Sequence, residues 1–318
     1  MTRVAAIDCG TNSIRLLVAD VDLAAGTLVD VVRRMEVVRL GQGVDRTGRI
    51  APEALERTLD ACRRYAAEAR ELGAGPVRFV ATSASRDAEN RQEFVDGVRD
   101  AFGVEPEVIS GGEEAALAFR GATAVLGGKH PGPYLVVDLG GGSTEIVLGA
   151  TSPVASWSMD VGCVRMTERH LESDPPSTEE IAAAVADVEA ALDEAGRTVP
   201  FGRAATLVGL AGTVTTVTAH ALDLDEYDPE LIDGAVLPVD RVLASCRTLL
   251  GMSRKRRAAL PFMHPGRVDV IGAGALVWSG VVSRVQAEVG RSGGRLGTVV
   301  TSEHDILDGI AWSAAELG

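Results

Sequence analysis

Two segments of this 318-residue chain repeat a pattern that can bind an anion. Residues 4–20 read VAAIDCGTNSIRLLVAD and residues 135–149 read LVVDLGGGSTEIVLG, so each places Asp-x-Gly-x-x-Ser between two apolar runs. Glycine lets the main chain approach a ligand closely, and the backbone N–H groups and hydroxyls of such a turn can surround a phosphate. A single turn is typical of a tight hairpin, but two with one spacing favour paired phosphate-binding loops. The residues concerned are Gly10, Thr11, Asn12, Ser13, Gly140, Gly141, Gly142, Ser143 and Thr144.

Three carboxylates accompany these turns. Asp8 and Asp138 stand where an apolar run meets its turn, and Glu145 follows Ser143 by two residues. Magnesium is commonly held by one or two carboxylates together with substrate oxygens, so all three are candidate ligands of Mg²⁺. Glu145 could equally be an outward-facing residue of an alternating strand.

Two further segments carry polar groups at the end of an apolar run. In SGGEEA, Glu114 could be a general base at a phosphate site, although carboxylates at a helix N-terminus are common for electrostatic reasons alone. In TSASR, Ser83 and Arg86 could clamp a phosphate, or could form an ordinary hydroxyl-stabilised turn with a solvated Arg.

The second half of the chain offers two weaker candidates. Gly212 and Thr213 lie in GLAGTV, a junction that fits either nucleotide binding or close packing of a strand against a helix. The run Arg254-Lys255-Arg256-Arg257 is most often a solvated surface, and a binding site for a polyanion is the alternative.

The elements that must position these residues alternate between strands and helices. Strands are expected at 4–8, 14–20, 29–39, 77–82, 104–109, 135–139, 145–149, 154–158 and 206–210. Helices are expected at 52–72, 90–102, 113–125, 177–195, from Gly212 onward, at 239–249, 268–285 and 303–316. Residues 127–133, GGKHPGP, are the best candidate for a linker between domains.

Composition limits the classes of protein that need to be considered. Apolar residues make up 46% of the chain, which is too high for a disordered protein. The net charge of -14 disfavours a nucleic-acid-binding coat. The most apolar long stretch, residues 204–222, is interrupted by glycines and threonines, so a buried strand and helix are expected there and no membrane partner. The N-terminus has no signal-peptide pattern, which places the protein in the cytoplasm.

The cysteines and histidines give no metal or redox motif. The cysteines at 9, 62, 163 and 246 are far apart, and no pair has the spacing of zinc ligands or of a redox dithiol. We therefore expect four reduced and mostly buried thiols. The five histidines are scattered, which makes a His-based metal site improbable.

Together these segments resemble the exopolyphosphatase / guanosine pentaphosphate phosphohydrolase family, in its short two-domain form. The resemblance rests on AIDCGTNSIRLLVAD, ATSASRDAEN, VISGGEEA, VVDLGGGSTEIV, VGCVRM and GLAGTVTTV, in this order along nearly the whole chain. It implies an α/β protein with two ribonuclease-H-like domains of the actin-like ATPase / sugar kinase superfold and an active cleft between them. The implied domains are residues 1–126 and 127–302, with the helix 303–318 packing back on the first.

The resemblance also implies roles for individual residues. Glu114 matches the catalytic glutamate of the family. Asp138 and Glu145 match positions associated with magnesium and the attacking water, and Arg86 matches an arginine that contacts phosphate. The implied activity is Mg²⁺-dependent hydrolysis of the terminal phosphoanhydride of inorganic polyphosphate or guanosine pentaphosphate. Because lysine is scarce, short polyphosphate chains are favoured over very long ones.

Two other functions remain open at this point. A kinase of the same superfold would need an adenine pocket near Gly212 and would depend on an acceptor. A non-catalytic sensor would bind guanosine tetraphosphate without turning it over. Relatives of this kind pair as dimers, so a homodimer is expected.

Overall fold

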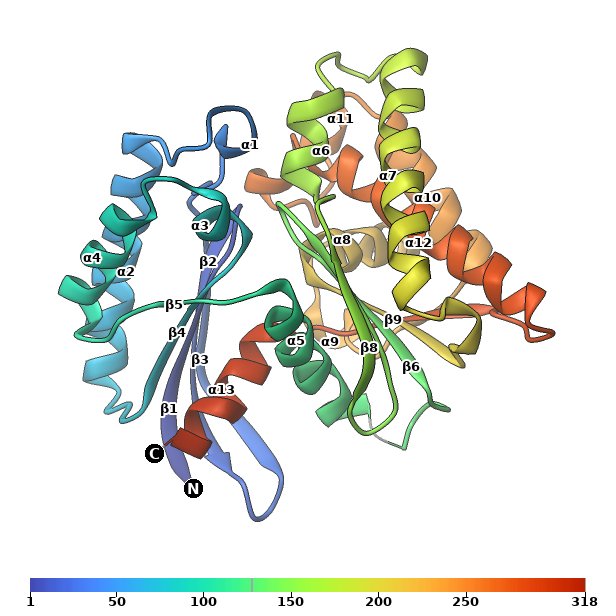
Figure 1. Ribbon diagram of the computed structural model, residues 1–318. Helices are drawn as coiled ribbons and strands as arrows, with labels where there is room; N and C mark the ends of the chain where they lie inside the picture. The colour runs from blue at the N-terminus through green and yellow to red at the C-terminus, as the bar shows by residue number, and fades with distance from the viewer. Residues whose placement is uncertain (127, 318) are drawn as a thin grey trace. The chain divides into compact units, whose positions relative to one another are not determined.

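The computed structural model describes residues 1–126 and 128–317. Gly127, the first residue of the expected linker, lies outside the described residues. The chain divides into two compact units. Unit 1 comprises Met1–Gly121 together with the C-terminal segment that begins at Ile306, and unit 2 comprises Ala122–Asp305. Each unit is built around one β-sheet (Figure 1).

The strands and helices have the following bounds. The strands are β1 (Thr2–Cys9), β2 (Ser13–Asp22), β3 (Thr27–Val37), β4 (Val77–Ala81), β5 (Glu107–Val108), β6 (Tyr134–Leu139), β7 (Thr144–Gly149), β8 (Pro153–Met159), β9 (Thr206–Leu210), β10 (Val236–Pro238) and β11 (Thr298–Thr301). The helices are α1 (Val44–Thr47), α2 (Pro52–Glu71), α3 (Ser83–Asp87), α4 (Arg91–Phe102), α5 (Gly111–Leu126), α6 (Cys163–His170), α7 (Thr178–Thr198), α8 (Ala211–Leu222), α9 (Pro229–Ile232), α10 (Val239–Gly251), α11 (Arg254–Ala258), α12 (Ile271–Arg291) and α13 (Ile306–Leu317). Short 3₁₀ turns, η1 (Phe201–Arg203) and η2 (Pro265–Arg267), complete the set.

The sheet of unit 1 has five strands in the order β3-β2-β1-β4-β5. β1, β2 and β3 form an antiparallel meander, whereas β4 and β5 run parallel to β1. The central strand β1 is buried over nearly its whole length, because helices cover both faces of the sheet. The carboxyl ends of β1 and β4 therefore meet at one edge of the sheet, where Cys9 is the register partner of Ala81.

The sheet of unit 2 repeats this arrangement. Its order is β10-β11-β9-β6-β7-β8, in which β6, β7 and β8 form the meander and β9 and β11 continue in parallel. β8-β7-β6-β9-β11 thus reproduces the order of unit 1, and β10 adds an antiparallel strand at the edge. The repeated sequence pattern marks the same hairpin, β1–β2 and β6–β7, in both sheets. This topology confirms the expected fold class, two ribonuclease-H-like α/β units of the actin-like superfold.

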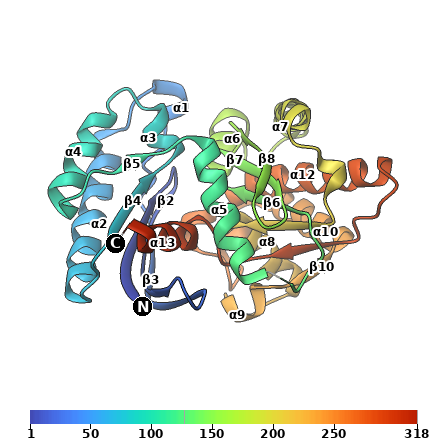
Figure 2. The same cartoon turned by 60° about the horizontal axis from the view of Figure 1, so that its bottom comes forward.

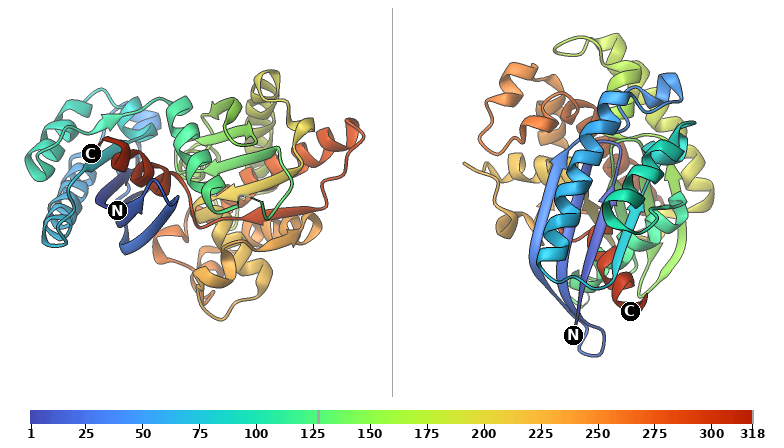
Figure 3. Two further views of the ribbon diagram at one scale, coloured as in Figure 1. Left: turned by 90° about the horizontal axis from the view of Figure 1, so that it is seen from below. Right: turned by 90° about the vertical axis from the view of Figure 1, so that its left-hand side faces the viewer.

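Helices cover the sheet of unit 1. α2 packs against α4 on one face, as Figure 3 shows, and α13 packs on β1, β2 and β4 (Figure 2). α2 begins with Pro52 in its first turn, and Gly73, with φ of 71°, follows its end. The core of this unit is built largely from small aliphatic residues with Phe79 and Phe94 at its centre.

The core of unit 2 is larger. α8 packs on β6, β9 and β11, and α12 packs across α6, α7, α8 and α10. Trp278 on α12 is fully buried beside Gly209 of β9, where a Cβ atom would lie 2.7 Å from the indole. α7 starts with a capping box in which Ser177 and Glu180 bond each other's backbone N–H groups. The close packing around α8 and α12 fixes the carboxyl edge of this sheet.

Most expected elements are present, and several boundaries differ. β5 is limited to Glu107–Val108 instead of residues 104–109, α12 begins at Ile271 instead of Val268, and α13 begins at Ile306 instead of Glu303. α6, β10 and β11 were not expected, because their segments are short and carry no clear hydrophobic period.

Two expectations about buried residues are confirmed. The stretch 204–222 forms β9 and α8, and all four cysteines are buried and free. Within the described residues, no helix is long and apolar enough to span a membrane.

Candidate active site

The first Gly-rich turn joins β1 to β2 in unit 1. The N–H of Gly10 donates to the carbonyl of Ser13 at 2.9 Å, which closes the turn. A second segment supports it: the N–H of Arg39 donates to the carbonyl of Asn12, and that of Gly41 to the carbonyl of Thr11. A Cβ atom on Gly41 would lie 2.3 Å from the Thr11 methyl group, so only glycine fits there. The turn is therefore held from both sides.

The hydroxyl of Thr11 is the feature of this turn that points to a ligand. Thr11 is buried, yet its Oγ1 has no hydrogen-bond partner within residues 1–126 and 128–317. A buried hydroxyl without a partner is costly and uncommon. Ser85 on α3, in the neighbouring segment, carries a second hydroxyl of this kind. Both fit a site whose acceptor, a phosphate oxygen, arrives with the substrate.

Arg86 and Glu114 lie at the same edge of the unit 1 sheet. α3 follows β4 directly, and its first turn is joined to β1 because the N–H of Thr82 donates to the carbonyl of Cys9. Arg86 Nη1 donates to the carbonyl of Ile109 at 2.8 Å and to Glu114 Oε2 at 3.2 Å. Glu114, in the first turn of α5, is buried, and this contact orients its carboxylate. Unit 1 thus gathers Gly10–Ser13, Ser83, Arg86 and Glu114 at the ends of β1, β4 and the strand preceding α5.

The second Gly-rich turn joins β6 to β7 in unit 2. The N–H of Gly140 donates to the carbonyl of Ser143, as in the first turn. The carbonyls of Gly140 and Gly141 accept the first N–H groups of α6, from Cys163 and Val164. The Thr144 hydroxyl donates to the carbonyl of Val161. This turn is therefore anchored to the start of α6.

Asp138 and Glu145 are direct cross-strand partners in the β6–β7 hairpin. Residues opposite each other in an antiparallel pair point to the same face, so the two carboxyl groups share one side of the sheet. They are only 7% and 2% exposed, and Ser158 on β8 donates to Glu145 Oε1 at 2.7 Å. Two buried carboxylates on one face repel each other unless a cation or a proton lies between them. The donor set suits a hard divalent cation that takes oxygen ligands.

The corresponding pair in unit 1 has a different chemistry. Asp8 lies opposite Arg15, and its Oδ2 accepts from Arg15 Nε and Nη2 at 2.9 and 2.6 Å. Arg15 therefore occupies the place of Glu145 and offsets the charge of Asp8. A role for Asp8 as a metal ligand stays a prediction. No group of three or more His, Cys, Asp or Glu in the described chain could hold a metal ion by protein ligands alone.

Gly212 and Thr213 lie in the first turn of α8, after the carboxyl end of β9. Ala211 has φ of 69°, a strained conformation for a residue with a Cβ atom. A Cβ atom on Gly212 would lie 2.5 Å from the guanidinium carbon of Arg267, whose Nη1 donates to Thr216 Oγ1 at 3.1 Å. The start of α8 therefore carries a positive side chain next to its backbone.

Thiols flank both turns without being reactive. Cys9 precedes the first turn, and Cys163 is bonded through its N–H to the second. Burial raises the pKa of the Cys9 thiol well above its usual value and that of Cys163 to about 11. Both are neutral near pH 7, so neither is a nucleophile.

Sequence reasoning did not identify three side chains that shape this site. Arg15 could have been found from the repeat. The offset of 130 residues that aligns Asp8 with Asp138 also aligns Arg15 with Glu145. Ser158 and Arg267 had no such signal. Ser158 acts through the neighbouring strand, and Arg267 reaches α8 from a loop more than fifty residues further along the chain.

Comparison with known proteins agrees with the resemblance. A model of the Ppx/GppA phosphatase family matches residues 17–295. Exopolyphosphatase 2 of Mycobacterium tuberculosis is 52% identical, covering 99% of this chain and 99% of that protein. The chain therefore spans nearly the full length of that relative.

Solved structures share the fold along the whole chain. An exopolyphosphatase-like protein is 48% identical, with a TM-score of 0.95 and full coverage of both chains. The PPX-GPPA enzyme of Aquifex aeolicus is 30% identical, with a TM-score of 0.79 over 98% of this chain and 99% of that one. The fold seen in both units is thus the fold of these relatives.

Proposed function

Because the chain belongs to the Ppx/GppA phosphatase family, we propose that it is an exopolyphosphatase, a hydrolase that removes the terminal phosphate of inorganic polyphosphate. The observation that carries the proposal is the buried Asp138–Glu145 pair beside a Gly-rich turn. The name of the mycobacterial relative supports polyphosphate as the substrate. Guanosine pentaphosphate offers the same terminal phosphoanhydride and is the second substrate that we propose.

Each unit has its own candidate phosphate-binding groups in this proposal. In unit 1 they are the backbone N–H groups of Gly10–Ser13, the hydroxyls of Thr11 and Ser83, and Arg86. In unit 2 they are Gly140–Thr144 and the start of α8 at Gly212 and Thr213. Backbone amides and hydroxyls in Gly-rich turns suit the oxygens of a terminal phosphate.

Asp138 and Glu145 are the residues that would hold a magnesium ion. Their two carboxylates lie on one face, and phosphate oxygens would complete an oxygen-rich shell. When bound, the ion would offset the charge of the phosphate oxygens. The hydroxyl of Ser158 orients Glu145 in this arrangement.

Glu114 acts as the general base. Its carboxylate accepts a proton from water, the water oxygen forms a bond to the terminal phosphorus, and the bond from that phosphorus to the bridging oxygen breaks. The products are orthophosphate and a chain shorter by one phosphate. Since the transition state of phosphoryl transfer is loose, positioning and electrostatics supply most of the acceleration. Arg86 keeps the Glu114 carboxylate in place.

Glu114→Gln tests this assignment. The amide cannot take a proton from water, so we expect turnover to fall at least about a hundredfold, the low end for acid–base groups. Initial rates of phosphate release with polyphosphate and Mg²⁺ measure the effect. Glu113→Gln is the matched control, because Glu113 is exposed and pairs with Arg78. Near-normal turnover in Glu114→Gln would remove this residue from the role.

A phosphate-release assay tests the function as a whole. It compares polyphosphate of several lengths, guanosine pentaphosphate and ATP, each with Mg²⁺ and with excess EDTA. We expect release from polyphosphate without any acceptor, and its loss in EDTA. Release that requires a sugar or another acceptor would indicate a kinase. Tight binding of guanosine tetraphosphate with no hydrolysis of any substrate would indicate a sensor.

We also propose a cytoplasmic homodimer. The family resemblance supports the dimer, and the similarity to an exopolyphosphatase supports the location. Light scattering during size-exclusion chromatography measures the oligomeric state, and a monomer over the working concentration range would contradict it.

A further inference from the structure

Three neighbouring cations of unit 2 have no side-chain partner among the described residues. We call Arg254, Lys255 and Arg256, at the start of α11, the basic turn. All three side chains are exposed, and none forms an ion pair or a side-chain hydrogen bond within the part of the chain that the structure describes. Some surface arginines, such as Arg3 and Arg64, bond a carboxylate, whereas these three adjacent cations do not. Three unpaired like charges in one turn repel one another in a protein of net charge -14.

The backbone of the basic turn is held firmly. Asp174 Oδ1 accepts from the N–H of Arg254 at 2.7 Å, and Ser253 Oγ accepts from the N–H of Arg256 at 3.4 Å. These contacts use backbone groups and leave the three cationic side chains free to meet solvent.

Arg257, the fourth basic residue of the run, has a different role. It is buried, and its guanidinium donates to the carbonyls of Leu249 and Leu250, both at 2.9 Å. Burial, together with the charge of Arg254, lowers its pKa from the usual range. A Cβ atom on Gly272 would lie 2.4 Å from this guanidinium. Arg257 thus fastens α11 to the end of α10 and the start of α12.

The basic turn is connected to the second Gly-rich turn through α6. The first N–H groups of α6 bond the carbonyls of Gly140 and Gly141, and the loop that follows α6 carries Asp174. α6 has eight residues, so it spans about 12 Å. On the other side, Gly274, two residues after Gly272, packs against Thr213 and Cys163. The basic turn is therefore held by the same elements that shape the candidate active site.

We propose that the basic turn binds internal phosphates of a polyphosphate chain whose terminal phosphate lies at the active site. The inference rests on the proposed function. A long linear polyanion fits three unpaired cations on a fixed turn, because each passing phosphate can pair with one of them. Short chains end before they reach the basic turn. The basic turn is thus a subsite that distinguishes long chains from short ones.

The triple variant Arg254→Gln, Lys255→Gln, Arg256→Gln tests this subsite. Exposed ion pairs are individually weak, but the variant loses three of them. The combined loss should raise KM for long polyphosphate by about tenfold. We expect kcat on long chains to stay unchanged and KM for tripolyphosphate to stay unchanged. Because ion pairing is screened by salt, KM for long chains should depend less on salt in the variant than in the wild type.

A matched control removes three other exposed arginines of unit 2. The control residues Arg197, Arg203 and Arg295 lie near the C-terminal end of α12, whereas Arg257, which holds the basic turn, contacts the start of this helix. Because the 21 residues of α12 span about 30 Å, the control residues are far from the basic turn. Arg197→Gln, Arg203→Gln, Arg295→Gln changes the net charge by the same amount. The control should leave the KM for long chains at the wild-type value. An equal rise in both variants would show a general charge effect and overturn the subsite.

Equilibrium binding separates this inference from the proposed function. Labelled long-chain polyphosphate is titrated into wild type and into both triple variants, with circular dichroism as a check on folding. Weaker binding in the basic-turn variant alone supports the subsite, even if no variant releases phosphate and the proposed function fails. Equal binding by wild type and the basic-turn variant overturns the subsite, even if all release phosphate normally.

Discussion

The two hairpins differ at one residue pair that decides their chemistry. Asp8 faces Arg15, whereas Asp138 faces Glu145. The first pair is a partly buried ion pair that neutralises itself. The second is a pair of buried acids that gains from a divalent cation. In the proposed function, the repeated turn is therefore a neutral phosphate loop in unit 1, whereas in unit 2 it lies beside a candidate cation site.

Thr11→Val tests the unpartnered hydroxyl of the first turn. Valine has the same shape, so replacing a buried hydroxyl that has no partner should raise the free energy of unfolding by about 1 kcal/mol. Affinity for substrate should fall, because a donor to the phosphate is lost, and KM should rise severalfold. Urea unfolding and steady-state kinetics measure the two effects.

Thr58→Val is the control for this prediction. The Thr58 hydroxyl is also buried but donates to the carbonyl of Ala54 at 2.7 Å. Its replacement should lower stability and leave KM unchanged. If Thr11→Val destabilised the protein as much as Thr58→Val and left KM unchanged, the Thr11 hydroxyl would have no role in binding.

At the scale of elements, the start of α6 supports the second Gly-rich turn. The N–H groups of Cys163 and Val164 bond the turn's carbonyls, and Gly162 packs directly on the backbone of Gly141. A Cβ atom on Gly162 would lie 2.5 Å from that carbonyl carbon. The position of the turn thus depends on a close approach between two backbone segments.

Gly162→Ala should therefore displace the second turn. We expect a loss of about 1–3 kcal/mol in the free energy of unfolding and a fall in kcat/KM. Gly290→Ala is the control: Gly290 lies in α12 with open space around it, so alanine should stabilise the helix by up to about 1 kcal/mol. Thermal unfolding and phosphate release measure both variants. A Gly162→Ala variant with normal kcat/KM would contradict the argument from backbone packing.

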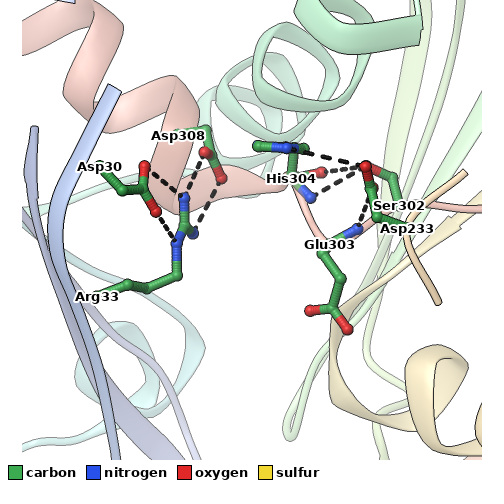
Figure 4. Close-up of polar contacts among 7 residues, drawn as sticks. All are labelled: Asp30, Arg33, Asp233, Ser302, Glu303, His304 and Asp308. Carbon is green, nitrogen blue, oxygen red and sulfur yellow. Dashed lines mark hydrogen bonds and ion pairs between the residues drawn. The ribbon is translucent and has the colours of Figure 1, made fainter. Parts of the chain in front are cut away.

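At the scale of the whole molecule, the C-terminal segment is fastened inside each unit separately. In unit 2, the N–H of Glu303 donates to Asp233 Oδ1 at 3.0 Å, and Ser302 bonds the backbone of His304. In unit 1, Arg33 on β3 bonds both Asp30 and Asp308, the latter at 2.6 Å (Figure 4). Asp308 is 2% exposed, so this contact fixes the start of α13 on the sheet.

Asp308→Asn should destabilise unit 1. The change removes the buried charge of the pair and leaves Arg33 paired with the more exposed Asp30, which should cost about 2 kcal/mol, given that Arg33 is partly exposed. Urea unfolding measures the loss. Asp20→Asn is the control, since Asp20 pairs with Arg3 at the exposed surface, where the loss of the pair should lower the free energy of unfolding far less. Equal effects of the two substitutions would contradict a structural role for the buried pair.

The sequence alone determined the features that local pattern encodes. The repeated Asp-x-Gly-x-x-Ser hairpins, the long helices with Pro or capping starts, and the apolar strands were all predictable, because each depends on neighbouring residues. The family and its α/β fold followed from motifs in a fixed order. Glu114 was named from the resemblance, since spacing alone favoured a helix-end charge.

Only the tertiary structure decided which side chains meet. The opposition of Asp138 and Glu145, the Ser158 contact, and Arg267 against Gly212 depend on strand register and on loops distant in sequence. The basic run likewise divides into one buried anchor and three exposed cations, although its four residues look alike in sequence. Burial and register arise from the packing of whole elements, and a local pattern of residue types does not specify that packing.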